Sequence, residues 1–94
     1  MIILNVTYKC KAGMREEFLG SIKAEGLDAA SRAEDGNFGY DYYFAADCPD
    51  ELLLVEHWRD AGALDVHSGQ PHFKRLGELK QQYVEETVIK RYEE

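Results

Sequence analysis

Residues 38–59 read FGYDYYFAADCPDELLLVEHWR, and this stretch decides the fold. Aromatic side chains recur at alternate positions over residues 38–45, which predicts a strand with Phe38, Tyr40, Tyr42 and Phe44 on one face. The segment 47–50 is typical of a turn. Residues 52–59 follow at hairpin distance, so we predict that the two strands pair antiparallel.

The sequence before this hairpin contains one strand pattern and two helical patterns. Residues 2–10 place apolar side chains at every second position, which predicts a strand. Residues 14–24 repeat apolar side chains at a helical spacing, which predicts an amphipathic helix. A second, shorter helical run covers residues 27–33.

The sequence after the hairpin completes the fold. Asp60 can cap a short helix over residues 61–67, and Pro71 suits the first turn of another helix. Residues 84–92 are rich in Val, Ile, Thr and Tyr, which predicts the last strand. The order is β-α-β-β-α-β, so we predict an α+β, ferredoxin-like single domain over residues 1–94 with an antiparallel sheet.

Both faces of the predicted sheet carry large aliphatic side chains. Leu52 and Leu54 point to one face of their strand, whereas Leu53 and Val55 point to the other. The helices can cover only one face, so we expect a second copy to cover the other and form a homodimer, a dimeric α/β barrel. The alternative is a monomer with a few exposed apolar residues, which is common.

Composition excludes several functions. The 94 residues carry a formal net charge of −7, which disfavours nucleic acid and anionic membranes as partners. Cys10 and Cys48 form no CxxC motif, and no segment is typical of a signal peptide, so we expect a cytoplasmic protein. Neither a metal-binding spacing nor a phosphate-binding glycine loop is present, and we predict no metal and no cofactor.

Three residues are the candidates for catalysis. Strand alternation places Glu56 and Trp58 on one face, and His67 ends the short helix that follows. A carboxylate, an indole N–H and an imidazole that converge at the edge of a core can hold a polar ring and move its protons. Each also has a purely structural interpretation. Trp58 could serve packing, Glu56 could cap a helix or bind backbone amides, and His67 could be a helix C-terminal residue favoured by the dipole.

Five further residues are candidates for substrate binding: Asn5, Tyr40, Tyr42, His72 and Phe73. An aromatic stripe at strand spacing is more often core than binding site, although a tyrosine hydroxyl could bind a carbonyl or phenol oxygen. Asn5 is either an edge or interface residue or an amide donor in a pocket. For His72, a surface position in the first turn of its helix is the favoured interpretation.

Six short segments carry a resemblance that extends over nearly the whole chain. They are Lys11-Ala12-Gly13 followed by Glu16-Glu17-Phe18, residues 33–37 leading into Tyr40, Asp50-Glu51-Leu52, Glu56-His57-Trp58, residues 63–67, and Pro71-His72-Phe73. With these segments the sequence resembles the antibiotic biosynthesis monooxygenase family of dimeric α+β barrels. The E-x-W, A-L-x-x-H and H-F series is specific for the family fold and much less so for one reaction.

The resemblance implies several activities. Some family members oxidise polyphenols or quinols with dioxygen and no cofactor, some degrade haem, and one branch isomerises a phosphorylated autoinducer-2 product. Trp58 and His67 match residues used by the haem-degrading and polyphenol-oxidising branches, Asn5 lies near an asparagine that serves them, and Glu56 matches the family's strand glutamate. We therefore expect a cofactor-independent monooxygenase of a small quinol or polyphenol, with His67 as general base. An isomerase of a small hydroxy-ketone, a haem-degrading monooxygenase and a non-catalytic ligand-binding dimer are the alternatives.

Overall fold

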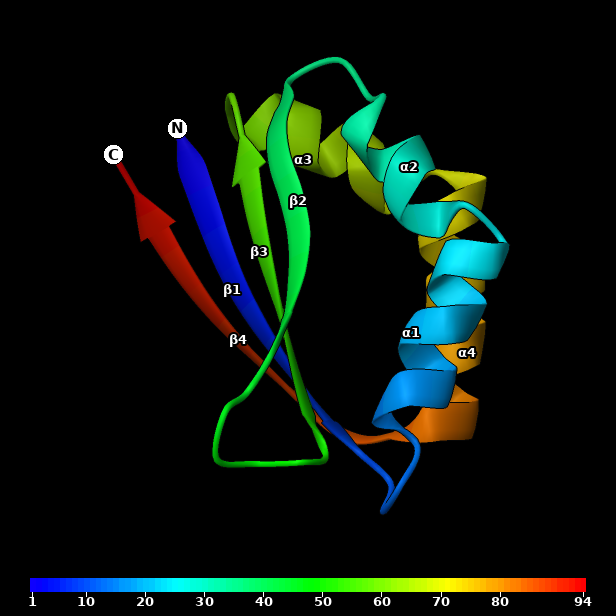
Figure 1. Cartoon of the computed structure of the whole chain (residues 1–94). Coiled ribbons are helices and arrows are strands. Elements are labelled where there is room, and N and C mark those ends of the chain that lie inside the picture. The colour runs from blue at the N-terminus through cyan, green and yellow to red at the C-terminus, as the bar shows by residue number, and fades with distance from the viewer.

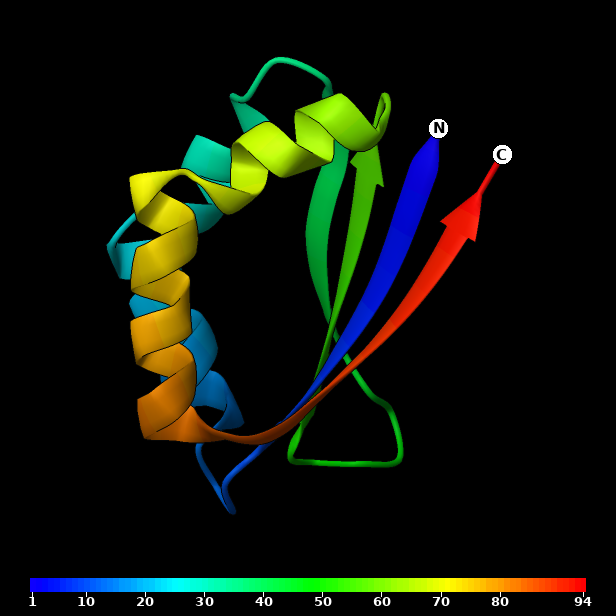
Figure 2. The same cartoon turned by 180° about the vertical axis from the view of Figure 1, so that it is seen from behind.

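A computed structural model describes all 94 residues and confirms the ferredoxin-like α+β arrangement. Its elements, in chain order, are β1 (Ile2–Cys10), α1 (Arg15–Ala24), α2 (Leu27–Arg32), β2 (Asn37–Phe44), β3 (Glu51–Trp58), α3 (Ala61–Ser68), α4 (Pro71–Tyr83) and β4 (Val84–Glu93). The strands form one antiparallel sheet in the order β2-β3-β1-β4, and the predicted hairpin is the β2–β3 pair. All four helices lie on one side of this sheet (Figures 1 and 2).

Alternation along the two central strands forms the core. The even-numbered residues of β1 and β3 are buried beneath the helices, while their odd-numbered neighbours stay partly or fully exposed. Helix α1 contributes Phe18 and Ile22, and helix α4 contributes Leu76 and Leu79, at the helical spacing that an amphipathic face requires. The side chains of Glu56 and Trp58 therefore point into the space between the sheet and the helices.

Local signals explain where the last two helices begin. The side chain of Asp60 accepts a hydrogen bond from the backbone N–H of Ala63 at 2.9 Å, which caps α3 as predicted. Pro71 lies in the first turn of α4, where its missing N–H leaves no bond unmade. Together they set the short α3 at an angle to α4 (Figure 2).

The start of β2 differs from the expected alternation. The register of β2 against β3 shifts between Asn37 and Gly39, which is an irregularity of the bulge type. Phe38 is 60% exposed, whereas Tyr40 is buried, so the regular alternation predicted from Phe38 to Tyr40 does not extend to the start of β2. The extra residue breaks the strict alternation on which that prediction rested.

The loop between α2 and β2 packs closely on α3. Gly36 has a φ of +84°, and a Cβ at this position would lie 2.7 Å from the Cβ of Ala63. Both the left-handed backbone and the close approach require glycine here. Because this approach brings the loop against α3, Glu34 comes within reach of the helix that carries His67.

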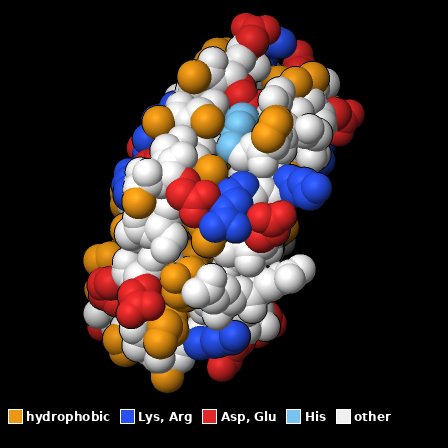
Figure 3. Space-filling view, turned by 90° about the vertical axis from the view of Figure 1, so that its right-hand side faces the viewer, with side chains coloured by type: hydrophobic (Ala, Val, Ile, Leu, Met, Phe, Trp, Pro, Cys, Tyr) orange, Lys and Arg blue, Asp and Glu red, His pale blue; other side chains and the backbone are white.

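The opposite face of the sheet has no helix over it. Ile3, Leu53, Val55 and Val88 lie there half-buried, and Tyr43 is exposed. On the helix side, acidic and basic side chains are interspersed, so that face has no continuous basic patch (Figure 3). None of the helices has the length and apolar character needed to cross a membrane.

Candidate functional site

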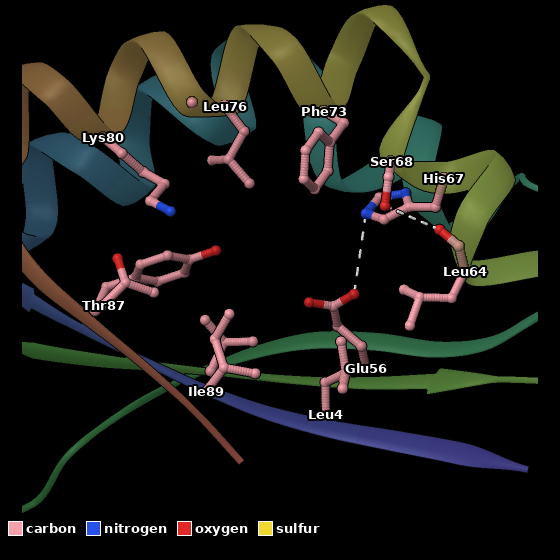
Figure 4. A pocket seen from close by; sticks show the side chains of 13 residues that line it. Leu4, Glu56, Leu64, His67, Ser68, Phe73, Leu76, Lys80, Thr87 and Ile89 are labelled. Atoms are coloured by element: carbon pink, nitrogen blue, oxygen red, sulfur yellow. Dashed lines mark hydrogen bonds and ion pairs between the residues drawn. The ribbon is translucent and has the colours of Figure 1, made fainter. Parts of the chain in front are cut away.

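A cavity of about 280 Å³ lies between β1 and β4 on one side and α3 and α4 on the other (Figure 4). This volume is near the lower end of the range for ligand pockets, about 300 to 1,000 Å³, and suits a small ligand. Its walls are mostly apolar: Leu4, Val6, Tyr8, Leu64, Phe73, Leu76 and Ile89. Polar side chains line its two ends, with Glu56, His67 and Ser68 at one end and Lys80 and Thr87 at the other.

The first polar end brings together a carboxyl group and an imidazole. The Oε1 atom of Glu56, from β3, lies 3.9 Å from the Nε2 atom of His67, from the last turn of α3. Both residues are buried, at 6% and 2% exposure. The His67 ring is held between aromatic neighbours, with its centroid 4.6 Å from that of Trp58 and 5.2 Å from that of Phe73. Its Nε2 atom therefore points to the cavity from a packed ring.

Glu34 lies behind His67, on the side away from Glu56. Its Oε2 atom lies 2.5 Å from Nδ1 of His67 and 2.8 Å from Nε2 of His72. A carboxylate can only accept, so each imidazole must donate an N–H to it. In neutral His67 the proton then sits on Nδ1, and Nε2 is left as an unprotonated acceptor that faces the cavity. A carboxylate that fixes the tautomer of a histidine base is the arrangement found in catalytic triads.

Burial shifts the titration of both groups at this end. Burial raises the pKa of Glu56 to about 7; the hydrogen bond from Trp58 opposes this, and the nearby charge of Glu34 adds to it. Burial lowers the pKa of His67, and its hydrogen bond to Glu34 offsets part of that effect. Near neutral pH, His67 is therefore mostly neutral, and Glu56 exists in both protonation states. Paired groups of this kind are typical of proton-transfer sites.

Trp58 contacts the site through Glu56. Its indole N–H donates to Oε1 of Glu56 at 2.9 Å, within the buried core. This donor is therefore already engaged in the structure, and Trp58 does not line the cavity. In this structure Trp58 contacts Glu56 and not the cavity, and its predicted part in catalysis stays a prediction.

The two tyrosines lie beside the site and not in the cavity lining. Tyr40 is 2% exposed, and its ring centroid is 5.8 Å from that of His67 and 6.0 Å from that of Tyr42. Burial raises the pKa of both hydroxyl groups, so they stay protonated near neutral pH. Their rings pack in the core, as the structural interpretation of the aromatic stripe holds.

The other predicted binding residues are divided between the cavity and the rest of the molecule. Phe73 lines the cavity. His72 points instead at Glu34, on the far side of His67. Asn5 pairs across the sheet with Val55 and Lys90 on the face without helices. Strand alternation turns its side chain away from this cavity, which fits the edge or interface alternative for Asn5; a part in substrate binding stays a prediction.

Two residues of this region were not predicted from the sequence. Glu34 lies in a loop, and no periodic pattern reveals a loop carboxylate whose partners are 33 and 38 positions away. Lys80 did have a signal, because it follows Phe73 and Leu76 at the helical spacing of seven and four residues. That spacing places its side chain on the face of α4 that lines the cavity.

One cluster has the composition of a metal site. The candidate ligand atoms of Glu34, His67 and His72 lie within 4.8 Å of one another. The same atoms satisfy one another as hydrogen-bond donors and acceptor, which accounts for the cluster without an ion. The absence of a metal and of a cofactor stays a prediction.

The sequence is similar to a known family and to curated relatives. The sequence model of the family described as antibiotic biosynthesis monooxygenase matches residues 1–79. The Bacillus subtilis (strain 168) protein named "Putative monooxygenase YcnE" is 36% identical over 74 residues, which are 79% of this chain and 76% of that protein. The Mycobacterium tuberculosis protein named "Putative monooxygenase Rv0793" is 44% identical over 63 residues, which are 63% of this chain and 61% of that protein.

Solved structures share the fold over its whole length. The crystal structure of PA3566 from Pseudomonas aeruginosa superposes with a TM-score of 0.88 and 27% sequence identity. The superposition covers 99% of this chain and 92% of that one.

Proposed function

Because the chain belongs to the antibiotic biosynthesis monooxygenase family, we propose that it is a monooxygenase that oxidises a small quinol or polyphenol with dioxygen. One observation carries the proposal. The Nε2 atom of His67 faces an apolar cavity as an unprotonated acceptor, while Glu34 holds the proton on Nδ1. This supports the proposal that a neutral base meets the hydroxyl group of an aromatic ring bound in the cavity.

In the proposed reaction, His67 removes the proton of a ring hydroxyl group. The electron-rich anion reacts with dioxygen at a C–H ring carbon ortho or para to that hydroxyl, and a carbon–oxygen bond forms to give a peroxide. His67 returns its proton to the peroxide, the O–O bond breaks, and the C–H hydrogen leaves with one oxygen atom as water. One carbonyl replaces the C–H group and the other replaces the hydroxyl. The substrate supplies all four electrons, so the balance requires no cofactor.

The surrounding residues support this chemistry in different ways. Glu56 lies 3.9 Å from Nε2 of His67 and can donate a hydrogen bond in its protonated form or accept one in its charged form. Trp58 fixes the position of the Glu56 carboxyl. The apolar walls, Phe73 among them, exclude water from the peroxide.

Oxygen consumption tests the proposal. Purified protein is mixed with a panel of hydroquinones and dihydroxynaphthalenes, and oxygen uptake is followed against a no-protein control. We expect saturable uptake of one dioxygen per substrate, unchanged by a chelator and lowered at least ~100-fold in His67→Ala, the size of a general-base contribution. His57→Ala is the matched control, because His57 lies on the opposite face of the sheet. An unchanged rate in His67→Ala would remove His67 as the base.

A second candidate function is an isomerase of a small hydroxy-ketone. The observation that favours it is the pairing of Glu56 and His67 at one cavity end, since such a pair can carry a proton between adjacent carbons without oxygen. Turnover under strict anaerobiosis distinguishes it from the monooxygenase.

We also propose that the protein is a homodimer and acts in the cytoplasm. The support for the dimer is the sheet face without helices, where Leu53 and Val55 lie partly exposed together with Tyr43. A second copy would cover these side chains symmetrically. Cys10 and Cys48 are both free, as expected in a reducing compartment.

A further inference from the structure

The cavity has a second polar end, which the proposed acid–base chemistry does not use. Lys80 extends from α4 into this end, opposite Glu56 and His67, with Thr87 of β4 beside it (Figure 4). Its ammonium group lies 5.5 Å from the ring centroid of Tyr8. No carboxylate lies within ion-pairing distance of Lys80, although most other basic residues of the chain form ion pairs. An unpaired cation therefore faces a largely apolar cavity.

The ammonium group of Lys80 is partly withdrawn from water. Lys80 is only partly exposed, and burial lowers its pKa, with no opposing charge to offset the effect. Anion binding would supply the missing partner and strengthen with the low polarity of the walls. The opposite end would repel an anion, because Glu56 and Glu34 are acidic. The two ends therefore differ in the charge that they accept.

We propose that Lys80 binds a carboxylate group of the substrate, so that the ligand is an aromatic carboxylate that bears its hydroxyl group at the far end of the ring system. The inference rests on the proposed function for the role of the hydroxyl end. The carboxylate binds between Lys80 and Thr87, and the apolar ring lies against Tyr8 and Leu76. The hydroxyl group then lies at the end of the cavity that carries His67. A single cation matches a monoanion, whereas a phosphate dianion would call for a second positive group.

Binding of redox-stable probes tests the proposal without turnover. Isothermal titration calorimetry is carried out with 6-hydroxy-2-naphthoate, its methyl ester and 2-naphthol. We expect the carboxylate to bind at least about tenfold more tightly than either neutral probe, as one charge-assisted contact allows. Lys80→Met should remove this preference and Lys80→Arg should keep part of it. Lys74→Met, an exposed position of the same helix, should leave it unchanged.

Three outcomes would overturn the proposal. The first is equal affinity of the wild-type protein for the carboxylate and its ester. The second is a preference that survives in a folded Lys80→Met protein, as judged by its circular dichroism and melting temperature. The third is tighter binding of 2-naphthyl phosphate than of the carboxylate. Oxygen uptake is measured separately, so the two proposals can fail independently. A preference for the carboxylate without any oxygen uptake would reject the monooxygenase and keep the anion site. Oxygen uptake with neutral quinols alone would reject the anion site and keep the monooxygenase.

Discussion

Replacing Glu34 by Gln tests whether a loop carboxylate controls His67, the proposed general base. The substitution keeps the size of the side chain and removes its charge. In the native protein one oxygen of Glu34 accepts N–H groups from His67 and His72, at 2.5 Å and 2.8 Å. An amide oxygen accepts more weakly, and an amide NH₂ turned toward His67 would favour the opposite tautomer. The substitution is therefore expected to lower the basicity of Nε2 of His67 and to leave its tautomer less well fixed.

The expected loss follows from the burial of this contact. The Glu34 side chain is 8% exposed, so water screens its interaction with His67 only weakly. A hydrogen bond to a charged group is worth about 2 kcal/mol, and its loss from the transition state lowers kcat/KM about 30-fold. The pH profile should also move. Glu34 raises the pKa of His67, so the acidic limb of kcat/KM should shift to lower pH in Glu34→Gln.

Oxygen uptake measured between pH 5 and 9 gives both kcat/KM and the position of the acidic limb of its pH profile. Glu16→Gln provides a matched control, because Glu16 is an exposed carboxylate on α1. The ¹⁵N shifts of the imidazole report the tautomer without any activity, and we expect Nδ1–H for His67 in the native protein. A native Nε2–H tautomer would refute the reasoning. The reasoning would also be refuted if the pH profile of kcat/KM in Glu34→Gln had the same plateau and the same acidic limb as in the wild type.

Two further predictions concern stability and assembly. Because the pKa of Glu56 is about 7 in the fold against 4.5 when exposed, the folded state binds more protons between these values, and wild-type stability falls as pH rises through them. Measured by urea unfolding, the free energy of unfolding of Glu56→Gln should therefore exceed that of the wild type by little at pH 4 and by roughly 3 kcal/mol at pH 8. A difference that does not change with pH would contradict this. Leu53→Lys should leave a monomer of 10.8 kDa in sedimentation equilibrium, because it places a charge on the open sheet face, whereas Val66→Lys on α3 should stay dimeric. A dimer that tolerates Leu53→Lys would exclude that face as the interface.

The sequence predicts the fold well because its signals are local and periodic. Period-two alternation in β1 and β3, the Asp60 cap and Pro71 each act within a few residues, and each lies where expected. The departure at Phe38 lies where a register shift breaks that alternation.

The site was harder to predict because it depends on contacts between distant segments. Alternation alone places Asn5 opposite the Leu4 face, and its assignment to the cavity came from the family resemblance. Glu34 reaches His67 only because Gly36 lets its loop lie against α3, a tertiary contact that leaves no periodic trace. Helical spacing could have placed Lys80 on the same face of α4 as Phe73 and Leu76. The sequence alone does not distinguish it from the other 10 Lys and Arg residues, because the cavity is seen only in the structure.

The carboxyl groups of Glu34 and Glu56 both lie near the imidazole of His67, and their surroundings differ. Glu34 accepts two N–H groups, from His67 and His72, on the side away from the cavity. Glu56 accepts a single N–H from a neutral indole inside the core, and burial holds its pKa near 7. The carboxyl group on the cavity side of His67 can therefore become neutral near pH 7. A substrate that brings its own carboxylate is then favoured in only one orientation, with that group at Lys80 and its hydroxyl group at the base.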